Sequence, residues 1–395
     1  MKRKILFLIF VVLIISLPVW LWQTSKSQGG ETIKISSAPY TIYKEGYYEL
    51  NNDISTQDPN DNAITIAADN VFLDLKSYKI SGLNDPYGDG SGVFSTDHKN
   101  ITVINGKITG FAYGVWIDQA SLLADRPVNP EVSVEKLTLD KNSYRGIKVL
   151  ANRAEIRDAD ISNTGGYQKL PNSAAIEIGG YNCRAQSNQI SNLLPVGINE
   201  GIGITVTNPY KNCQISDNTV EQSVAPEYGR VFGFWVNQLP NSGQYVQVKN
   251  NTIRKTTYAY WYSGLDEVDR ISKFSNNTLD SIDCSRKDLP DYYVSNPLIE
   301  SNNWINETDG CSDSEDNFLE KSEQGDPRAQ YRLADIYYHN IKNFLKSEAP
   351  EEKKLRLQKA YDLYSKAAEN LSGMEKDVAE GYRDGLATQL GINVN

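Results

Sequence analysis

Apolar and polar residues alternate in short runs that recur along the chain, most clearly between Tyr181 and Leu279. Four successive units share the same four positions. Each has two residues, one residue apart, that are predicted to point inward (the inward pair), then an asparagine, and then an apolar residue that ends the unit (the closing residue). These positions are Cys183, Ala185, Asn188 and Ile190, then Cys213, Ile215, Asn218 and Val220, then Val246, Val248, Asn251 and Ile253, and then Ser272, Phe274, Asn277 and Leu279. Self-similarity of this length is the sequence signature of a solenoid. Alternate residues of a strand point to opposite faces, so the apolar members are predicted to face a core.

The same frame extends towards the N-terminus in weaker copies. The closing apolar residue recurs at Ile80, Ile108, Leu139, Ile161, Ile190, Val220, Ile253 and Leu279. An earlier strand of each unit carries a second inward pair, at Ile64/Ile66, Val93/Ser95, Val115/Ile117, Ile147/Val149, Ile176/Ile178, Ile204/Val206, Phe234/Val236 and Tyr260/Tyr262. Three short strands per turn predict a mainly β chain, a parallel β-helix of about eight rungs and roughly 40 Å in length at the usual strand spacing.

An asparagine occupies one turn position in four successive rungs. The four residues are Asn188, Asn218, Asn251 and Asn277. Stacked amides bond one another and the turn backbone, as in other asparagine ladders. We therefore predict a structural role for them and no catalytic one.

Two phrases in the first half of the repeat resemble rungs of a known superfamily. NVFLDLKSYKISG at residues 70–82 and KNITVINGKITGFAYGV at residues 99–115 are similar to the right-handed parallel β-helix proteins of the pectate-lyase-like superfamily. The resemblance covers about Ile64 to Leu279 and implies the fold. That fold hosts lyases, epimerases, hydrolases and non-enzymes, so it does not fix an activity. The Asp-Pro-His-Asp motif of its uronate epimerases and the Gly-His-Gly motif of its polygalacturonases are absent here.

The N-terminus has the pattern of a membrane anchor. Lys2, Arg3 and Lys4 precede an apolar run over residues 5–22, which is long enough to span a bilayer. We predict an uncleaved transmembrane signal anchor over residues 1–23, in the inner membrane, with the rest of the chain in the periplasm. A linker over residues 24–36 and the β-helix with its N-terminal cap over residues 37–283 are expected to follow.

The C-terminal part changes to helical periodicity. After a predicted linker over residues 284–314, Asp326 and Pro327 give an N-cap and a first-turn proline. LEKSEQGDPRAQYRLADIYYHN and KAYDLYSKAAEN resemble a Sel1-like repeat, a relative of the tetratricopeptide repeat. We therefore predict Sel1-like helical repeats over residues 315–395. The resemblance implies a module that binds a protein partner or packs against its own chain.

The four cysteines fit an oxidising compartment. Cys284 and Cys311 bracket an irregular segment, and we predict a disulfide between them. Cys183 and Cys213 point inward at stacked positions, where a pair of core thiols and a disulfide are both open interpretations. We favour the thiols, because buried cysteine packs as a small hydrophobe.

The net charge of −10 argues against nucleic acid as a partner, because phosphate binding requires basic patches. The loop over residues 81–92 places Asp85 and Asp89 beside glycines. It has the composition of a calcium loop and equally of an ordinary Gly/Pro turn, which we favour. The sequence indicates no other cofactor.

One predicted strand carries aromatic residues on its outward face. Phe94, Trp116, Trp235 and Trp261 are expected to be exposed there. Long loops over residues 81–91, 162–174, 191–202 and 221–231 precede this strand in several rungs and should wall its outer face, and an insertion over residues 118–130 leaves the opposite edge. Aromatic rings offer flat apolar surfaces on which sugar rings stack, so these four residues are predicted to bind substrate, together with Asp118 and Asp140. The alternative is that the loops or helices cover the rings as ordinary core.

Charged residues lie between the aromatic groups. Lys148 and Glu177 are on adjacent rungs, with Tyr144 and Arg145 just before Lys148. Uronate lyases and C5-epimerases need a base for the C5 proton and positive charge to stabilise an enolate-like intermediate. These four residues are the predicted catalytic set. The alternative is a salt-bridged surface ladder without a catalytic role.

The sequence therefore predicts a membrane-anchored protein facing the periplasm that binds an envelope or extracellular polysaccharide. Lyase or C5-epimerase chemistry is one hypothesis for its activity. The alternative is a non-catalytic scaffold or assembly factor that binds a protein partner through residues 315–395. Whether the protein is an enzyme is left open.

Overall fold

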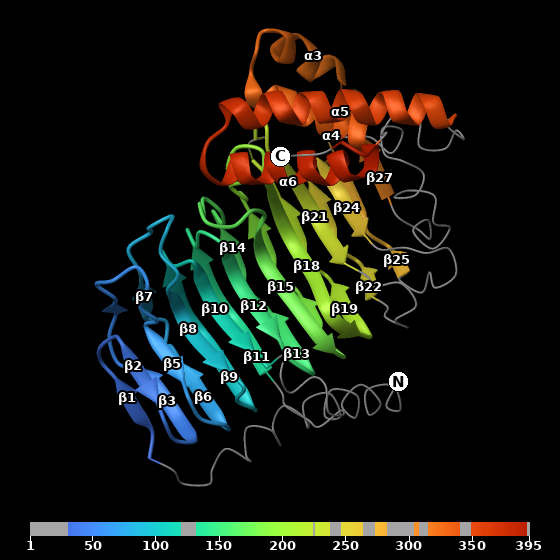
Figure 1. Ribbon diagram of the computed structural model, residues 1–395. Coiled ribbons are helices and arrows are strands. Elements are labelled where there is room, and N and C mark those ends of the chain that lie inside the picture. The colour runs from blue at the N-terminus through green and yellow to red at the C-terminus, as the bar shows by residue number, and fades with distance from the viewer. Residues whose placement is uncertain are drawn as a thin grey trace, which may run out of the picture.

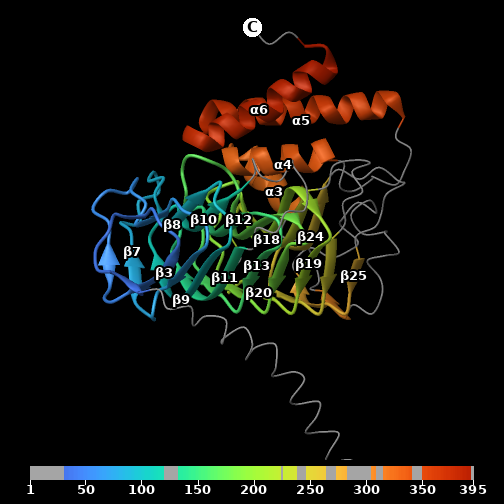
Figure 2. The same ribbon diagram turned by 90° about the horizontal axis from the view of Figure 1, so that it is seen from below.

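The computed structural model describes residues 31–119, 132–223, 226–237, 246–263, 273–282, 304–307, 315–339 and 349–392. They form a right-handed parallel β-solenoid with a group of helices along one side (Figures 1 and 2). The predicted anchor and the predicted Cys284–Cys311 disulfide lie outside these residues. Among the helices within them, none combines the length and the apolar character that crossing a membrane requires.

The chain of the solenoid passes through two parallel sheets. Sheet B is defined by nine strands in the described residues. They are β2 (Tyr40–Ile42), β5 (Ile64–Ile66), β8 (Ser91–Thr96), β10 (Tyr113–Asp118), β12 (Arg145–Leu150), β15 (Ser173–Tyr181), β18 (Glu200–Lys211), β21 (Arg230–Asn237) and β24 (Tyr258–Ser263).

Sheet A contains the other two segments of each turn, eighteen strands in the described residues. They are β1 (Ile33–Ile35), β3 (Gly46–Leu50), β4 (Ile54–Ser55), β6 (Val71–Asp74), β7 (Lys79–Ser81), β9 (Ile101–Thr109), β11 (Val132–Asp140), β13 (Ala154–Arg157), β14 (Asp160–Ser162), β16 (Arg184–Gln186), β17 (Gln189–Ser191), β19 (Cys213–Ser216), β20 (Thr219–Glu221), β22 (Val246–Lys249), β23 (Thr252–Arg254), β25 (Lys273–Ser275), β26 (Thr278–Ile282) and β27 (Trp304–Glu307).

The predicted register of sheet B is confirmed. Val93 pairs with Val115, and Val115 pairs with Ile147. The series continues through the equivalent residues of β15, β18, β21 and β24. The members of the predicted inward pairs from Ile64 to Val236 are buried. A solenoid core of stacked aliphatic side chains is therefore the main source of stability, since burying apolar surface drives folding.

The asparagine ladder is also confirmed. Each side-chain oxygen accepts hydrogen bonds from the preceding rung. Asn188 donates to Asn218 Oδ1 through its backbone N–H (3.0 Å) and its Nδ2 (2.9 Å), and the same pair of bonds links Asn218 to Asn251 and Asn251 to Asn277. All four amides are fully buried. They satisfy backbone groups that a bend in the core would otherwise leave unpaired.

The preferred interpretation of Cys183 and Cys213 was wrong, because the two residues form a disulfide. Cys213 is the first residue of β19, and Cys183 lies just before β16 on the adjacent rung, with the two Cα atoms 4.5 Å apart. Stacking in register, which we expected to pack two thiols, also places the sulfur atoms within bonding reach.

Two predicted boundaries differ from the structure. The predicted linker over residues 24–36 includes β1, which pairs with β3 and buries Ile35. The predicted linker over residues 284–314 includes β27, which pairs in parallel with β26. Sheet A thus has one more strand at each end than the repeat predicted. The sequence does not indicate β1 or β27, because each is too short to show a clear alternation of apolar and polar residues.

The C-terminal part forms helices, as predicted. They are α3 (Glu315–Glu323), α4 (Pro327–His339), α5 (Pro350–Asn370) and α6 (Gly373–Leu390). Asp326 caps α4, because its Oδ1 accepts hydrogen bonds from the backbone N–H groups of Arg328 (2.9 Å) and Ala329 (3.0 Å). We call α3–α6 the helical module.

The helical module docks on two loops that lead into sheet B. Arg332 of α4 is fully buried and donates hydrogen bonds to the backbone oxygens of Tyr228 and Ile198. Asp335, also buried, forms an ion pair with Arg230 at the start of β21. The module therefore lies along the amino-terminal ends of β18 and β21 and stands out from the outer face of sheet B (Figures 1 and 2).

Candidate functional site

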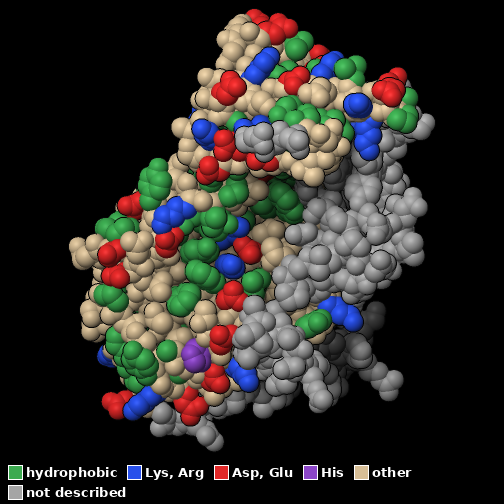
Figure 3. Space-filling model, viewed as in Figure 1, with side chains coloured by type: hydrophobic (Ala, Val, Ile, Leu, Met, Phe, Trp, Pro, Cys, Tyr) green, Lys and Arg blue, Asp and Glu red, His purple; other side chains and the backbone are tan. Residues whose placement is uncertain are grey.

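The outer face of sheet B presents one residue of each strand in a continuous row. Strand pairing aligns Phe94, Trp116, Lys148, Glu177, Thr205, Trp235 and Trp261. Trp116 and Trp235 are four strands apart, which is roughly 19 Å at the usual strand spacing. The row places polar and charged residues between two groups of rings, and the space-filling view shows both kinds of side chain on this face (Figure 3). The side chain of Trp261 lies outside the described residues.

The first aromatic patch is larger than the sequence predicted. The Trp116 ring packs against Phe94 (5.2 Å between centroids) and stacks on Tyr113 (4.4 Å). Tyr113 contacts Tyr144, which in turn contacts Tyr167. Phe94 and Trp116 are therefore half-buried and not exposed as predicted, because neighbouring rings cover part of each.

The second aromatic patch lies towards the other end of the row. Trp235, also half-buried, meets Phe232 edge-to-face at 5.6 Å, and Phe232 stacks on Tyr258 at 5.1 Å. Phe232 and Tyr258 are buried. The predicted site residues did not include Tyr113, Phe232 or Tyr258. A signal was present, since each of the three lies three residues before an outward tryptophan.

A charged cluster separates the two patches. Glu177 Oε2 accepts a hydrogen bond of 2.5 Å from Arg145 Nε, and Glu177 Oε1 lies 3.9 Å from Lys148 Nζ. Lys148 Nζ also lies 5.1 Å from the centroid of Trp116, and the Arg145 guanidinium lies 3.8 Å from that of Tyr144. The structure thus brings together the four predicted catalytic residues and joins them to the first patch by cation–π contacts.

Members of this cluster differ in how accessible they are. Arg145 is buried and donates further hydrogen bonds to the backbone oxygens of Asn172 (2.7 Å) and Tyr144 (3.2 Å). The side chain of Lys148 retains 18% of its exposure, more than that of Arg145 or Glu177. Burial raises the pKa of the Tyr144 phenol above its ordinary value of 10.0, so this hydroxyl keeps its proton at neutral pH.

The two predicted aspartates of the site are in different places. Asp118 ends β10 in sheet B and is half-buried beside the polar row. Asp140 ends β11 in sheet A, where its carboxylate accepts hydrogen bonds from Ser162 Oγ (3.1 Å) and Asn163 Nδ2 (2.7 Å) of the next rung. The structure therefore does not bring Asp140 into the charged cluster.

The predicted calcium loop has interactions of its own. Asp85 Oδ1 accepts a hydrogen bond of 2.7 Å from the backbone of Tyr87 within the turn. Asp89 contacts Tyr167 and Lys169. Burial raises the pKa of the Asp89 carboxyl, but hydrogen bonds from Lys169 and Tyr167 outweigh it and lower that pKa. Within the described ranges, no group of three or more His, Cys, Asp or Glu residues is arranged to hold a metal ion.

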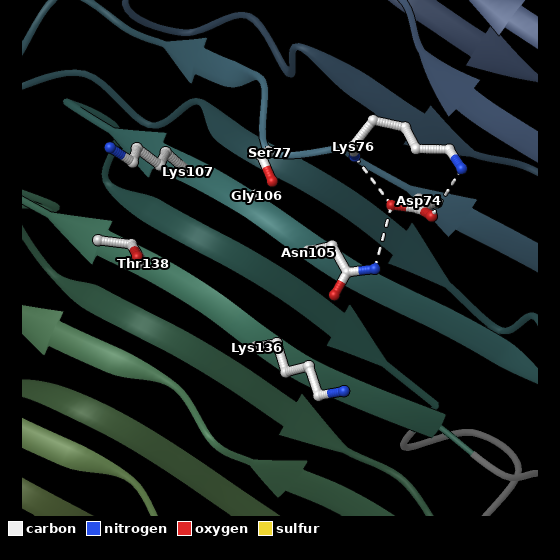
Figure 4. Close-up of a pocket in the computed structure, with 8 residues that line it drawn as sticks. All are labelled: Asp74, Lys76, Ser77, Asn105, Gly106, Lys107, Lys136 and Thr138. Atoms are coloured by element: carbon white, nitrogen blue, oxygen red, sulfur yellow. Dashed lines mark hydrogen bonds and ion pairs between the residues drawn. The ribbon is translucent and has the colours of Figure 1, made fainter.

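A pocket of about 420 Å³ opens on the outer face of sheet A. It is lined by Asp74, Lys76, Ser77, Asn105, Gly106, Lys107, Lys136 and Thr138. Asp74 accepts hydrogen bonds from the Lys76 backbone (2.8 Å) and Asn105 Nδ2 (3.3 Å), and the ammonium groups of Lys107 and Lys136 point away from each other (Figure 4). The lining has no aromatic ring, and its acid Asp74 is already paired with Lys76 at 3.4 Å, so the outer face of sheet B is the better candidate site.

The comparisons with known proteins agree with the fold. Residues 91–278 match a family model described as a right-handed β-helix region. No curated protein and no solved structure matches the chain. From strand β8 to strand β26, the part of the chain that carries the aromatic row, the protein is therefore a right-handed β-helix.

Proposed function

We propose that the outer face of sheet B binds a polysaccharide chain that runs along the solenoid axis. One observation carries this proposal: the strand register aligns Trp116 and Trp235 on one face with Lys148, Glu177 and Thr205 between them. Flat apolar rings at both ends suit the C–H faces of sugar rings, and the partly exposed Lys148 between them suits their hydroxyl and carboxyl groups. Half-buried aromatic patches with convergent polar groups are typical of ligand sites.

The charges of the centre favour an acidic sugar. Arg145 and Lys148 supply two positive charges, and Glu177 supplies one negative charge. The balance of +1 contrasts with the chain's net charge of −10. A uronate carboxylate placed beside Lys148 therefore meets local attraction inside an otherwise repulsive surface.

Uronate lyase or C5-epimerase chemistry is the finer form of the proposal. Glu177 takes the C5 proton, and Arg145 and Lys148 stabilise the negative charge that spreads onto the sugar carboxylate. Tyr144 donates its proton to the leaving C4 oxygen in a lyase, as the C4–O bond breaks and the C4–C5 double bond forms. In an epimerase it donates to the opposite face of C5. Tyr144 carries the proton that this step requires, because burial holds the pKa of its phenol above the ordinary value of 10.0.

Binding is tested with the purified full-length protein on a panel of acidic and neutral oligosaccharides. Trp116→Ala is expected to weaken binding at least about tenfold, because it removes the ring at the centre of the first patch. Phe72→Ala is the matched control, since Phe72 forms an aromatic pair with Tyr47 on sheet A at 5.3 Å. Equal binding by the wild type and a folded Trp116→Ala variant would contradict the proposal.

The chemical step has a separate test. The full-length protein is incubated with polyuronates, and the appearance of unsaturated ends and of inverted C5 centres is followed. Activity in the wild type and its loss in Glu177→Gln, with binding retained, are the expected results. Binding without either product refutes the chemical step and leaves the binding proposal in place.

Membrane attachment is a further part of the proposal. The basic residues at the N-terminus and the apolar run over residues 5–22 support an anchor that holds the solenoid in the periplasm. Deletion of residues 5–22 is expected to release the protein from the membrane fraction in cells. Persistent membrane association of the deletion variant, at physiological salt, would contradict the anchor.

Exposed apolar residues of the helical module support a second candidate function, that of a scaffold. Leu355 of α5 is 62% exposed, and Leu319 of α3 is also exposed. In this alternative, Sel1-like repeats bind a protein partner through residues 315–395. Each variant is expressed in a strain that lacks the wild-type gene, and restoration of the phenotype of that deletion is measured. Loss of restoration with Leu355→Asp, but not with Trp116→Ala or Trp235→Ala, would favour the scaffold over the polysaccharide site.

A further inference from the structure

The helical module has a partly exposed aromatic corner of its own. Tyr338, near the end of α4, meets Tyr382 of α6 edge-to-face at 6.0 Å. Tyr382 also stacks on buried Tyr364, with centroids 5.4 Å apart and planes 13° apart, yet it is 38% exposed. Tyr364 thus covers one face of the Tyr382 ring, Tyr338 and Tyr331 contact the ring at an angle, and part of it remains exposed. That is the geometry that makes Trp116 a candidate for stacking on sugars.

This corner lies at the amino-terminal edge of sheet B. Tyr364, on which Tyr382 stacks, donates a hydrogen bond of 3.2 Å to Asp335, and Asp335 pairs with Arg230 at the start of β21. Both ribbon views place α4 and α6 beyond the outer face of the sheet at this edge (Figures 1 and 2). The space-filling view shows a hollow between the helices and the sheet, with hydrophobic side chains inside it (Figure 3).

Strand β21 connects the corner with the second aromatic patch. β21 begins at Arg230, beside the corner, and carries Phe232 and then Trp235, which contact each other. Arg230 and Trp235 are five residues apart, or about 17 Å along a strand. A branched or bent glycan chain can contact both the floor formed by Trp235 and the wall formed by Tyr382.

The position of the wall is fixed by buried polar contacts. Arg332 binds the backbone of both loops beneath the module, and the Arg328 guanidinium forms two hydrogen bonds of 2.9 Å with Glu375 of α6. Glu375 also accepts a hydrogen bond of 3.1 Å from the backbone of Ile198. A binding site is more effective when rigid elements hold its side chains in place.

Resting on the polysaccharide site proposed above, we propose that Tyr338 and Tyr382 form a second subsite that takes a neutral sugar unit of the same polysaccharide. Two arginines, Arg230 and Arg332, face two acids, Glu200 and Asp335, so the edge of the corner is balanced in charge. It lacks the excess positive charge of the Arg145, Lys148 and Glu177 cluster. The helical module then serves as a wall of the glycan site.

The test uses the full-length protein and a panel of homopolymeric uronates, neutral β-glucans and mixed acidic-neutral oligosaccharides. Tyr382→Ala is expected to weaken binding of mixed oligosaccharides about threefold to tenfold and to leave pure uronates unchanged. Tyr382→Leu keeps apolar bulk against Tyr364 and is expected to show the same loss with a folded module. Tyr43→Ala, which removes a 75% exposed ring distant from the site, is the matched control.

Each result decides between the two proposals. Unchanged binding of every probe by folded Tyr382→Leu, together with a loss in Trp116→Ala, overturns the second subsite and keeps the main one. A loss in Tyr382→Leu that is equal for pure uronates and mixed probes overturns the assignment to a neutral sugar. No binding of any probe by the wild type overturns both.

Discussion

The solenoid and the helical module are held together in different ways. The solenoid has an aliphatic core, an amide ladder and a disulfide between neighbouring rungs. The module is attached to it through buried charges, with Arg332 and Asp335 of α4 facing Glu200 and Arg230 of the solenoid. A repeated apolar core tolerates small changes in one rung, whereas a buried ion pair is costly to break because its partner is left unpaired. The attachment is therefore the more vulnerable of the two.

The largest effect is expected at the attachment. Arg332→Ala leaves Asp335 and Glu200 without one of their cations and removes two hydrogen bonds to loop backbone. The loss of stability of the module should be about 4 kcal/mol, the usual range for breaking a buried pair. Denaturant unfolding followed by circular dichroism should show a helical transition that separates from the β transition.

A surface arginine provides the control for this change. Arg383 on α6 pairs with Glu380 and Asp384 of its own helix. Arg383→Ala should cost about 1 kcal/mol or less, as for other exposed pairs. Equal effects of the two substitutions would contradict the proposed difference between the regions.

The disulfide is expected to have the next largest effect, on the solenoid alone. Cys183 and Cys213 are 30 residues apart, and a bridge across such a loop stabilises by about 3.6 kcal/mol in the chain-entropy model. The double substitution Cys183→Ala and Cys213→Ala should shift the β transition to lower denaturant. A shift confined to the helical transition would contradict the prediction that the disulfide stabilises the solenoid and not the helical module.

The asparagine ladder should contribute somewhat less at each position. Asn218→Ala removes the acceptor of two hydrogen bonds from Asn188 and leaves those donors buried. The cost should be about 2 kcal/mol, since a buried unsatisfied group is penalised by 1–3 kcal/mol. Gln214→Ala, on the outward face of the same rung, is the control. If the ladder did not stabilise the fold, the two variants would unfold at the same denaturant concentration.

The smallest expected effect is a loss of stability of the helical module at acidic pH, through Asp326. Burial raises the pKa of Asp326, but hydrogen bonds from Tyr228 and from the backbone of Ala329 and Arg328 outweigh it and lower that pKa below 3.8. A lowered folded-state pKa contributes stability that is present above the unfolded value and lost as the pH falls through the folded one. The helical transition should therefore weaken below pH 3.8 more in the wild type than in Asp326→Asn. An identical acid response would contradict a role for this carboxylate.

The same contrast explains what the sequence predicted. In the solenoid each rung packs against a copy of itself, so the positions of Ile147, Ile176 and Asn218 follow from the period alone. Docking of the module depends on loops that do not repeat, and nothing in the spacing of Arg230, Arg332 and Asp335 indicates that they meet. The prediction was therefore correct where residues that are neighbours in space hold the same position in successive repeats.

The candidate site was predictable to the same extent. Alternation along the strands put Trp116, Lys148, Glu177 and Trp235 on one face, and the strand register agrees. The degree of exposure was not predictable, because it depends on rings such as Tyr167 that loops bring from other rungs. Asp140 was misplaced relative to the cluster because the chain turns from sheet A to sheet B between Asp140 and Arg145.

Binding of one polysaccharide chain across both aromatic patches is tested by the affinity of the full-length protein for acidic oligosaccharides of increasing length. If one chain lies across both aromatic patches, affinity rises until the oligosaccharide spans from Trp116 to Trp235, roughly 19 Å at the strand spacing. Trp235→Ala then removes the gain of the long chains and leaves the affinity of the short ones unchanged. Affinity independent of length, or a Trp235→Ala variant that binds long chains as tightly as the wild type, would contradict the account.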